Sequence, residues 1–303
     1  MPTYSILITG ASGMLGSALL TSWGERHTIC ATATRKPVAW PCNVVPFIEF
    51  SFESADFSAL KAHCAPDVIV NCAAMTDHEA CLAEPERAWA VNALAPAKLA
   101  EVFPQAYLIQ VSSDAVFGGD ARSPSENFPA HPDTVYGQTK LEGERLLLKA
   151  HKNAVVLRTT LVGLGGRRAK PSLAQWMIDS LEENRPLHLY TDVLFTPVNI
   201  WDFTSLLDWC INARPHGTLN ACGPEPISKH DFGIKLAQAC GLSTSGISPD
   251  TLASRQSSVA RRLDQSLDSQ HLTELRGQPL PSVNACVAGI ARRYHESKNY
   301  RRF

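Results

Sequence analysis

Hydrophobic and polar positions follow two different periods along the first half of the chain. Residues 4–9, YSILIT, are almost continuously apolar and β-branched, which is typical of a strand buried on both faces. From Met14 onward, apolar residues such as Leu15 and Leu19 recur at helical spacing. The same patterns predict further strands at 27–34, 44–50, 66–74, 105–113 and 153–163, and helices at 54–65, 84–103 and 135–152. Strands that alternate with helices predict an α/β fold with a doubly wound parallel sheet, whose ligands lie at the carboxyl ends of its strands.

The regular alternation ends near residue 163, although helical patterns continue at 173–184, 201–213 and 229–241. We therefore expect a first domain at 1–162, with a return segment at about 192–222, and a smaller, partly interleaved lobe at 163–303. The last stretch, 291–303, is basic, which favours a solvated or frayed tail over a binding element.

Composition indicates a soluble globular protein, because 45% of the 303 residues are hydrophobic and 19% are charged. The formal net charge of -1 gives no reason to expect a nucleic-acid or membrane-surface partner. The first residues lack the basic stretch of a signal peptide, and no apolar run approaches the length of a membrane-spanning helix. Nine cysteines without a C-x-x-C pair predict buried thiols in a reducing compartment, so we expect a cytoplasmic protein.

Three glycines, Gly10, Gly13 and Gly16, lie where the first predicted strand gives way to the first predicted helix. Glycine lets the backbone approach a ligand closely, and a helix N-terminus offers unpaired N–H groups and the positive end of a dipole. These features suit a phosphate group. The alternative is a tight turn that contains a packing glycine.

Tyr136 and Lys140 are four residues apart in the predicted helix at 135–152, so their side chains share one face. An ammonium group beside a phenol lowers the phenol's pKa from about 10, which would let the tyrosine exchange a proton near neutral pH. Ser112 and Ser113 end the preceding strand, at the sheet edge where a ligand is expected. Taken alone, the Tyr/Lys pair also fits a solvated helix face, and the serines fit a strand-end cap.

The glycine turn, the strand-end serine and the Tyr/Lys pair occur in the order found in the extended short-chain dehydrogenase/reductases. Within that family the chain resembles the dTDP-4-dehydrorhamnose reductase group of nucleotide-sugar 4-ketoreductases. The resemblance rests on the stretches NCAAMT, EPERAWAVNALAP, SSDAVF, YGQTK and RTTLVG, and weaker matches in FTPVNIWDF, GTLNACGPEPIS and ARRLDQSLD extend it over about nine-tenths of the chain. The chain departs from the family at Ala115, where relatives carry Tyr, and at Leu263, where they carry Pro.

The resemblance implies a Rossmann domain with a smaller C-terminal substrate-binding lobe, and hydride transfer between a nicotinamide dinucleotide and a sugar carbonyl. Tyr136 would donate a proton to the carbonyl oxygen, and Ser113 would hydrogen-bond that oxygen. Lys140 would lower the pKa of Tyr136 and hold the nicotinamide ribose. The implied cofactor-binding residues are Gly10, Ser12, Gly13, Met14, Leu15, Gly16, Thr34, Arg35, Lys36, Asn71, Cys72, Ala73, Ala74, Asn92, Ser112, Tyr136 and Lys140.

The expected substrate is a small nucleotide-linked 4-keto-6-deoxy sugar. Its implied contacts are Thr76, Asp114, Ala115, Arg167 and Arg262. Arg167 lies in a glycine-containing basic loop that suits a diphosphate, although a plain solvated loop explains it equally well. No metal site is expected, because the acidic and histidine residues at 77–79 are neighbours at a predicted helix start. A homodimer is compatible with the sequence.

The expected cofactor is NADP(H). NAD-binding relatives usually carry Asp or Glu about twenty residues after the glycines, where the carboxylate holds the ribose 2′-OH. Here Thr34 stands at that position and is followed by Arg35 and Lys36. Two cations beside a hydroxyl favour a 2′-phosphate, and the alternative is a pair of solvated loop charges.

Two other functions stay open. One is a sugar-nucleotide epimerase or dehydratase of the same superfamily, although Asp114 is followed by Ala115 where a dehydratase usually has a second acid. The other is a non-catalytic, dinucleotide-binding regulatory subunit, because relatives of this reductase group include one that modulates methionine adenosyltransferase. The presence of Ser113, Tyr136 and Lys140 argues against that second alternative.

Overall fold

The computed structural model describes residues 3–35, 45–53, 56–119, 121–165, 171–254 and 262–300. Residues 299 and 300 are described by their backbone only. The chain divides into two compact units. Unit 1 comprises Met1–Gly118, Pro129–Arg158 and Thr204–Leu219, and unit 2 comprises Gly119–Phe128, Thr159–Phe203 and Asn220–Phe303. Each unit is therefore assembled from three separate segments of the chain.

A seven-stranded sheet forms the centre of unit 1. Its strands are β1 (Ser5–Thr9), β2 (Thr28–Ala33), β3 (Phe47–Glu49), β4 (Val68–Asn71), β5 (Tyr107–Ser113), β6 (Ala154–Thr159) and β11 (Gly217–Asn220). They are arranged in the order β11-β6-β5-β4-β1-β2-β3, and the pairs β1–β2, β1–β4, β2–β3 and β4–β5 are parallel. The strand order reverses at β1, and in sheets of this kind ligands bind outside the carboxyl ends of the strands at the reversal.

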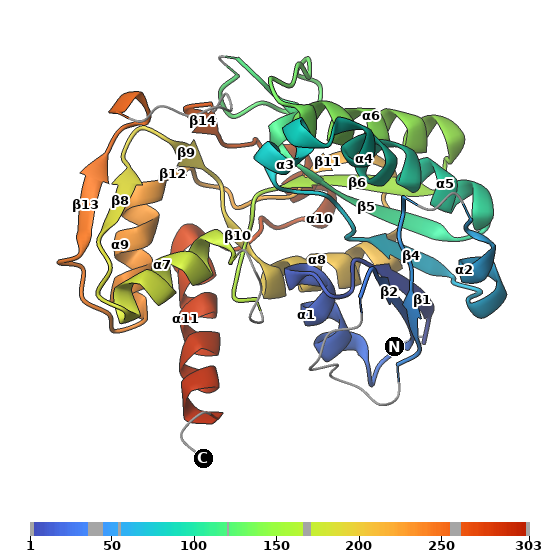
Figure 1. The fold of residues 1–303 in the computed structure, drawn as a ribbon, viewed down its shortest axis with the longest axis horizontal. Helices are drawn as coiled ribbons and strands as arrows, with labels where there is room; N and C mark the ends of the chain where they lie inside the picture. Colours follow the sequence, from blue (N-terminus) through green and yellow to red (C-terminus); the bar gives the residue numbers. More distant parts are fainter. Residues whose placement is uncertain are drawn as a thin grey trace. The chain divides into compact units, whose positions relative to one another are not determined.

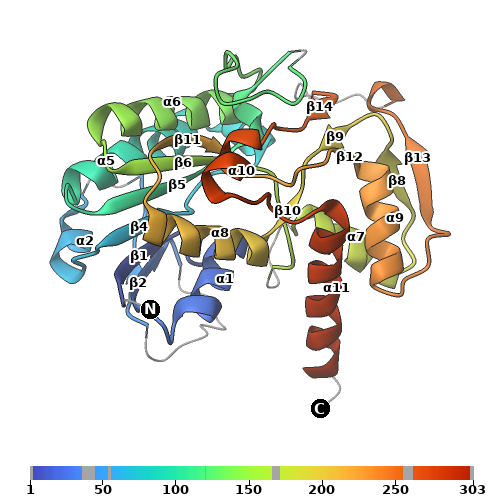
Figure 2. The same ribbon diagram turned by 180° about the vertical axis from the view of Figure 1, so that it is seen from behind.

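Helices cover both faces of this sheet. They are α1 (Met14–Trp23), α2 (Ser58–His63), α3 (His78–Ala83), α4 (Pro85–Ala88), α5 (Ala95–Val102), α6 (Val135–Ala150) and most of α8 (Ile200–Ala213), with a π-helix η1 (Trp89–Leu94) and a 3-10 helix η2 (Asp114–Val116). Helices α4, α5 and α6 lie on one face, and α1 and the unit 1 part of α8 lie on the other (Figures 1 and 2). Ile6, Leu7 and Ile8 are completely buried between these layers. The predicted doubly wound α/β fold is confirmed.

Unit 2 combines short strands with longer helices around its own apolar core. Its strands are β7 (Leu161–Val162), β8 (Leu187–Tyr190), β9 (Leu194–Phe195), β10 (Val198–Asn199), β12 (Ile227–Ser228), β13 (Ile247–Asp250) and β14 (Asp264–Gln265). Its helices are α7 (Leu173–Glu182), α9 (Lys229–Ala239), η3 (Leu252–Ser254), α10 (Gln270–Arg276) and α11 (Val283–Tyr300). The strands pair as β10-β7, β12-β9-β14 and β13-β8. Met177, Phe232 and Ile290 are fully buried at the centre of the core.

Three elements differ from the predicted ones. The strand predicted at 153–163 is divided into β6 and β7, because Val198 of β10 pairs with Leu161 and draws the second part into another sheet. The stretch from 291, expected to be a frayed tail, continues α11 to Tyr300, and its first turn is anchored by the buried Ala291 and Tyr294. Inside the helix predicted at 84–103, residues Trp89–Leu94 form a π-helix.

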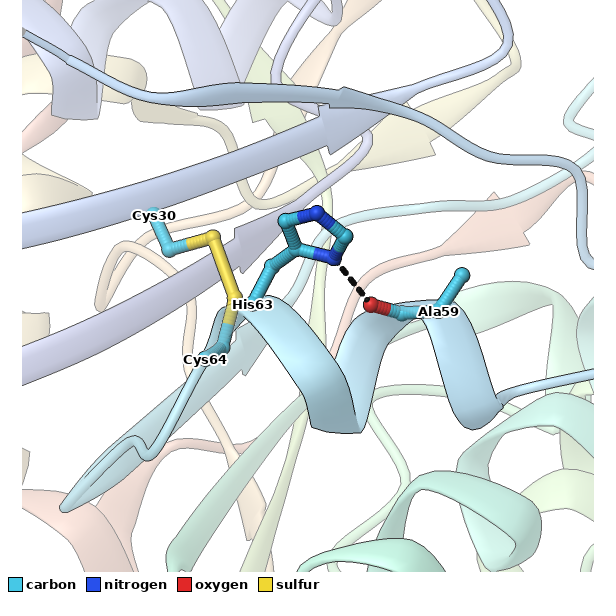
Figure 3. The surroundings of a disulfide bond; sticks show 4 residues. All are labelled: Cys30, Ala59, His63 and Cys64. Atoms are coloured by element: carbon cyan, nitrogen blue, oxygen red, sulfur yellow. Dashed lines mark hydrogen bonds between the residues drawn. A yellow bond between two sulfur atoms is a disulfide. The ribbon is translucent and has the colours of Figure 1, made fainter.

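The helix start predicted at 77–79 is confirmed, since the Asp77 carboxylate accepts hydrogen bonds from the N–H groups of Glu79 and Ala80 at the start of α3. The prediction of free thiols is wrong for two cysteines. Cys30 of β2 is joined by a disulfide to Cys64, the residue that follows α2, and the two Cα atoms are 6.5 Å apart (Figure 3). The 34-residue separation gave no sign of this pairing, which arises because the fold brings the end of α2 beside β2. Among the described residues, no helix is both long and apolar enough to cross a bilayer.

Candidate functional site

Gly10 occupies the tightest point of the turn between β1 and α1. Its φ of +62° lies in the left-handed region, and a Cβ atom there would be 2.7 Å from the amide nitrogen of Ala73. The Gly13 N–H donates a hydrogen bond of 2.7 Å to the Gly10 carbonyl, and a Cβ atom on either Gly13 or Gly16 would collide with that same oxygen. All three positions therefore exclude side chains, and the backbone of the turn lies directly against the loop that follows β4.

The turn leads into an open helix N-terminus. Helix α1 begins at Met14 with Gly13 as its N-cap, and no side chain caps it. The N–H groups of its first turn have no partner inside the helix, and the positive end of the helix dipole adds to their attraction for anions. Ser12 and Met14 are partly exposed beside the turn, whereas Leu15 is buried and can offer only its backbone. The cradle fits a pyrophosphate group.

The end of β2 lies beside this turn. Thr32 of β2 pairs with Thr9 of β1, and its carbonyl accepts a hydrogen bond of 3.0 Å from the Ala11 N–H. Thr34 and Arg35 follow the strand directly, and both are exposed. Lys36, which was predicted to act with them, lies outside the described residues.

A row of buried hydrogen bonds crosses the sheet below the glycine turn. The Thr9 hydroxyl donates to Oδ1 of Asn71, Nδ2 of Asn71 donates to Oε1 of Gln110 at 2.6 Å, and Nε2 of Gln110 donates to the Val111 carbonyl at 2.9 Å. The row joins β1, β4 and β5. The Asn71 amide is therefore used inside the sheet, while residues 72–74, which follow it, are partly exposed.

Ser113 and Tyr136 meet where β5 ends and α6 begins. A hydrogen bond joins their side chains, and each residue is only 8% exposed. Oγ of Ser113 also donates to the Asp114 carboxylate at 2.9 Å and accepts from the Ala115 N–H at 3.2 Å. The Thr134 hydroxyl caps α6 by accepting a hydrogen bond from the Gly137 N–H, which fixes Tyr136 in the first turn of the helix.

The pKa of Tyr136 lies above its usual value, chiefly because burial disfavours the phenolate. The hydrogen bond with Ser113 lowers this pKa, and the nearby Asp114 carboxylate raises it. The pKa of Tyr136 therefore does not lie below 10 as predicted, because burial outweighs the hydrogen bond with Ser113. At neutral pH the phenol carries its proton. The His78 ring packs against the Tyr136 ring, with centroids 4.8 Å apart.

Lys140 lies one turn further along α6 and is 3% exposed. Its Nζ atom donates a hydrogen bond of 2.7 Å to the Val111 carbonyl, the same oxygen that accepts from Gln110. The pKa of Lys140 is lowered from 10.5 to about 8, chiefly by burial, against the opposing influences of the Glu144 carboxylate and, less, of Cys72. The ammonium form therefore still prevails at pH 7, and it has three N–H donors, of which Val111 uses one.

Asn92 connects the loop after β4 to α6. Its Oδ1 accepts from the Met75 N–H at 2.9 Å, and its Nδ2 donates to the Met75 carbonyl at 3.0 Å and to the Thr139 hydroxyl at 3.1 Å. Thr139 stands just before Lys140 in the sequence of α6. Because these contacts use both ends of the amide, Asn92 fits a role in positioning the backbone around the site rather than in direct contact with a ligand. Asn92 lies in the π-helix η1, and π-helices occur frequently at functional sites.

The predicted substrate contacts fall into three groups. Asp114 and Ala115 lie beside Ser113, and Ala115 also packs against Tyr136. Thr76 is exposed at the end of the loop after β4. Arg262 is a buried residue of unit 2, and Arg167 lies outside the described residues.

Two buried charged residues near Lys140 were not predicted. Glu144 of α6 and Arg158 of β6 form an ion pair, with Nη2 of Arg158 2.7 Å from Oε2 of Glu144. The signal was present in the sequence, because Glu144 follows Lys140 by four residues and Arg158 is a charge in an otherwise apolar strand pattern, AVVLRT.

Unit 2 contains a cavity of about 270 Å³ lined by residues of α7, α11 and the start of α8. Its polar groups contact one another: Lys298 and the Tyr294 hydroxyl each lie 2.7 Å from Oε1 of Glu182, and Gln175 donates to Asp179 at 2.7 Å. Arg293, the other cation of the lining, pairs with Glu296 at 2.9 Å.

Known proteins share both the sequence pattern and the fold of this chain. A probable dTDP-4,6-dihydroxy-2-methyloxan-3-one 4-ketoreductase of Streptomyces antibioticus is 31% identical over 81% of this chain and 80% of its own length. The methionine adenosyltransferase 2 subunit beta of Xenopus laevis is 28% identical over 83% of this chain and 76% of its own. The structure of dTDP-4-dehydrorhamnose reductase from Bacillus anthracis in complex with NADP superposes with a TM-score of 0.81, at 21% identity over 95% of this chain and 99% of that one.

The family model described as the RmlD substrate binding domain matches residues 4–295, nearly the whole chain. The two reductases above support the predicted resemblance to the dTDP-4-dehydrorhamnose reductase group of the extended short-chain dehydrogenase/reductases. This chain belongs to the RmlD substrate binding domain family.

Proposed function

We propose that this protein is an NADP(H)-dependent reductase of a nucleotide-linked 4-keto-6-deoxy sugar, similar to dTDP-4-dehydrorhamnose reductase. The observation that carries the proposal is the meeting of Ser113 and Tyr136 at the carboxyl edge of the sheet, with Lys140 one helical turn away. A relative named as a 4-ketoreductase supports the reaction class.

The residues around the glycine turn fit a dinucleotide. The uncapped N-terminus of α1 suits the pyrophosphate of the dinucleotide. Because Gly10 and Gly13 have no side chains, the pyrophosphate can approach the backbone there. The exposed Thr34 and Arg35 at the end of β2 favour a 2′-phosphate, so NADP(H) is the proposed cofactor. The Bacillus anthracis reductase was crystallised with NADP, which agrees with this choice.

When bound, the dinucleotide would supply the hydride. The chain would supply the proton and the groups that orient the carbonyl oxygen. The Tyr136 phenol is protonated at neutral pH, as an ordinary phenol is, and burial raises its pKa further. It can therefore donate that proton to the oxygen of the carbonyl that is being reduced. The Ser113 hydroxyl would hydrogen-bond the same oxygen by turning its proton away from the Asp114 carboxylate. The Lys140 ammonium, fixed by Val111, would stabilise the phenolate that remains and hold a ribose hydroxyl.

The proposal is tested by following the absorbance of NADPH with a panel of nucleotide-linked keto sugars. Turnover of a 4-keto-6-deoxy sugar, with no turnover of the matching 4-hydroxy sugar, is the expected result. Tightly retained NAD and interconversion of hydroxy epimers would instead favour an epimerase.

A non-catalytic regulatory subunit is the second candidate, and it is favoured by the 28% identity to methionine adenosyltransferase 2 subunit beta over most of both chains. Binding of NADPH without turnover of any sugar in the panel, together with co-purification of a partner enzyme, would support this candidate.

A further inference from the structure

The ion pair between Glu144 and Arg158 is buried in unit 1, with side-chain exposures of 3% and 7%. Nε of Arg158 lies 3.2 Å from Oε1 and 3.1 Å from Oε2 of Glu144, in addition to the 2.7 Å contact of Nη2. The Phe117 ring covers the guanidinium group at 4.9 Å. Two buried charges are costly unless they are well paired, so this arrangement needs a reason beyond stability.

The carboxylate also contacts the strand that ends in the site. The Ser112 hydroxyl donates a hydrogen bond to Oε1 of Glu144, and Ser112 lies directly before Ser113 in β5. One residue earlier, the Val111 carbonyl accepts from Lys140. Glu144 and Lys140 therefore hold consecutive residues of the same strand end.

The Glu144 carboxylate also acts on the Lys140 ammonium through its charge. The two residues are four apart on α6, which places their side chains on one face of the helix. The ammonium is further faced by the Cys72 thiol, and Tyr136 precedes it by one turn. Burial disfavours the ammonium, and the negative charge of Glu144 is the larger of the two influences that oppose this effect.

We propose that Glu144 is a positioning residue of the reductase site: its buried carboxylate keeps Lys140 in the charged form and, through Ser112, fixes the strand end that carries Ser113. Arg158 serves this role by fixing the orientation of the carboxylate through its hydrogen bonds to both oxygens. The proposal rests on the proposed function, because Lys140 and Ser113 are assigned their roles there. The alternative is a purely structural ion pair.

The first measurement does not depend on activity. The protein is labelled with 13C at the ε-carbon of lysine, and the resonance missing from Lys140→Arg is assigned to Lys140 and titrated with pH. In Glu144→Gln the titration midpoint of Lys140 is expected to fall by about 1 pH unit or more, because the neighbouring negative charge is gone. Glu142→Gln, the same change at a more exposed position of α6, is the matched control and should leave the midpoint in place.

Glu144→Gln leaves the Arg158 guanidinium buried and unpaired, which could prevent folding. The double variant Glu144→Gln/Arg158→Met removes both charges at similar volume, and its Lys140 midpoint is compared with that of Arg158→Met, so that the two proteins differ only in the Glu144 charge. An unchanged Lys140 midpoint in Glu144→Gln, or equal midpoints in Arg158→Met and the double variant, overturns the proposal. A lowered melting temperature with an unchanged midpoint identifies a purely structural pair.

The second measurement concerns the site itself. The affinity for NADPH should decline at high pH as Lys140 loses its proton, and in the Glu144 variants this decline should move to lower pH by the same amount as the midpoint. If wild-type protein binds no NADPH at any pH while the midpoint still shifts, the proposed function fails and the influence of Glu144 on Lys140 stands. If wild-type protein binds NADPH and the midpoint does not shift, only the role of Glu144 fails.

Discussion

Gly143 of α6 lies so close to the carbonyl oxygen of Asn92 that a Cβ atom on this glycine would overlap it. The contact joins α6, which carries Tyr136 and Lys140, to the π-helix η1. The π-helix η1 and α6 can therefore pack this closely only because residue 143 has no side chain.

Gly143→Ala should destabilise the protein by about 1–3 kcal/mol, because the added methyl group forces α6 and η1 apart. The gain in helix propensity, about 1 kcal/mol, offsets only part of this loss. Urea unfolding measures the change. Gly246→Ala is the control, since a Cβ atom there would have its nearest neighbour at 3.8 Å. Equal stability of the two variants would contradict the predicted overlap.

Tyr136→Phe removes the proposed proton donor and keeps the ring that packs against His78 and Ala115. We expect reduction to fall by about 100-fold or more, while the affinity for NADPH changes little. Stopped-flow reduction and fluorescence titration measure the two quantities. Undiminished reduction in this variant would remove Tyr136 from the mechanism.

Arg35→Ala should weaken binding of NADPH by about 10-fold or more and leave NADH almost unaffected, because only NADPH carries the 2′-phosphate. The preference should also shrink as salt is raised, since the exposed guanidinium is screened. Arg145→Ala is the control, as this residue is exposed on α6. Equal loss of affinity for both dinucleotides would falsify the proposed phosphate contact.

Lys140 makes the stability of the protein depend on pH. Its pKa is lowered from 10.5 to about 8 in the folded chain, so between these values the folded state releases a proton that the unfolded state keeps. The free energy of unfolding should therefore increase as pH rises through that window, by at most about 3 kcal/mol from this residue.

In Lys140→Met this dependence on pH disappears. The stability of the variant relative to the wild type should therefore be greatest below pH 8, where the wild type carries the full cost of burying the ammonium. Chemical unfolding across the pH range measures it. A constant difference between the two proteins would show that the buried amine does not titrate as described.

The central sheet and its main helices could be predicted because their patterns are local. The apolar run of β1, the helical spacing after Met14 and the amphipathic pattern of residues 135–152 each identify their element without reference to the rest of the chain. The π-helix could not be predicted, because the pattern of residues 84–103 fits a continuous α-helix equally well. The division between β6 and β7 depends on pairing with β10, distant in sequence.

The candidate site divides along the same line. The glycine turn, the strand-end serines and the Tyr/Lys spacing are short-range signals. The structure joins Ser113 to Tyr136 by a hydrogen bond, and the catalytic roles of these residues stay predictions. The direction of the Tyr136 pKa could not be read from spacing, because burial decides it. Glu144 was not predicted because its proposed role depends on the ion pair with Arg158. Arg158 belongs to β6, which lies beside β5 in the sheet. The roles assigned to Lys36 and Arg167 stay predictions.

The buried row that runs from Thr9 through Asn71 and Gln110 to the Val111 carbonyl has a geometric consequence. One end adjoins the glycine turn, and the other is the oxygen that anchors Lys140. Stretching or shearing this row would leave buried polar atoms without partners, at a cost of about 1–3 kcal/mol for each one. The row therefore holds the separation between the glycine turn and the oxygen that anchors Lys140 nearly constant.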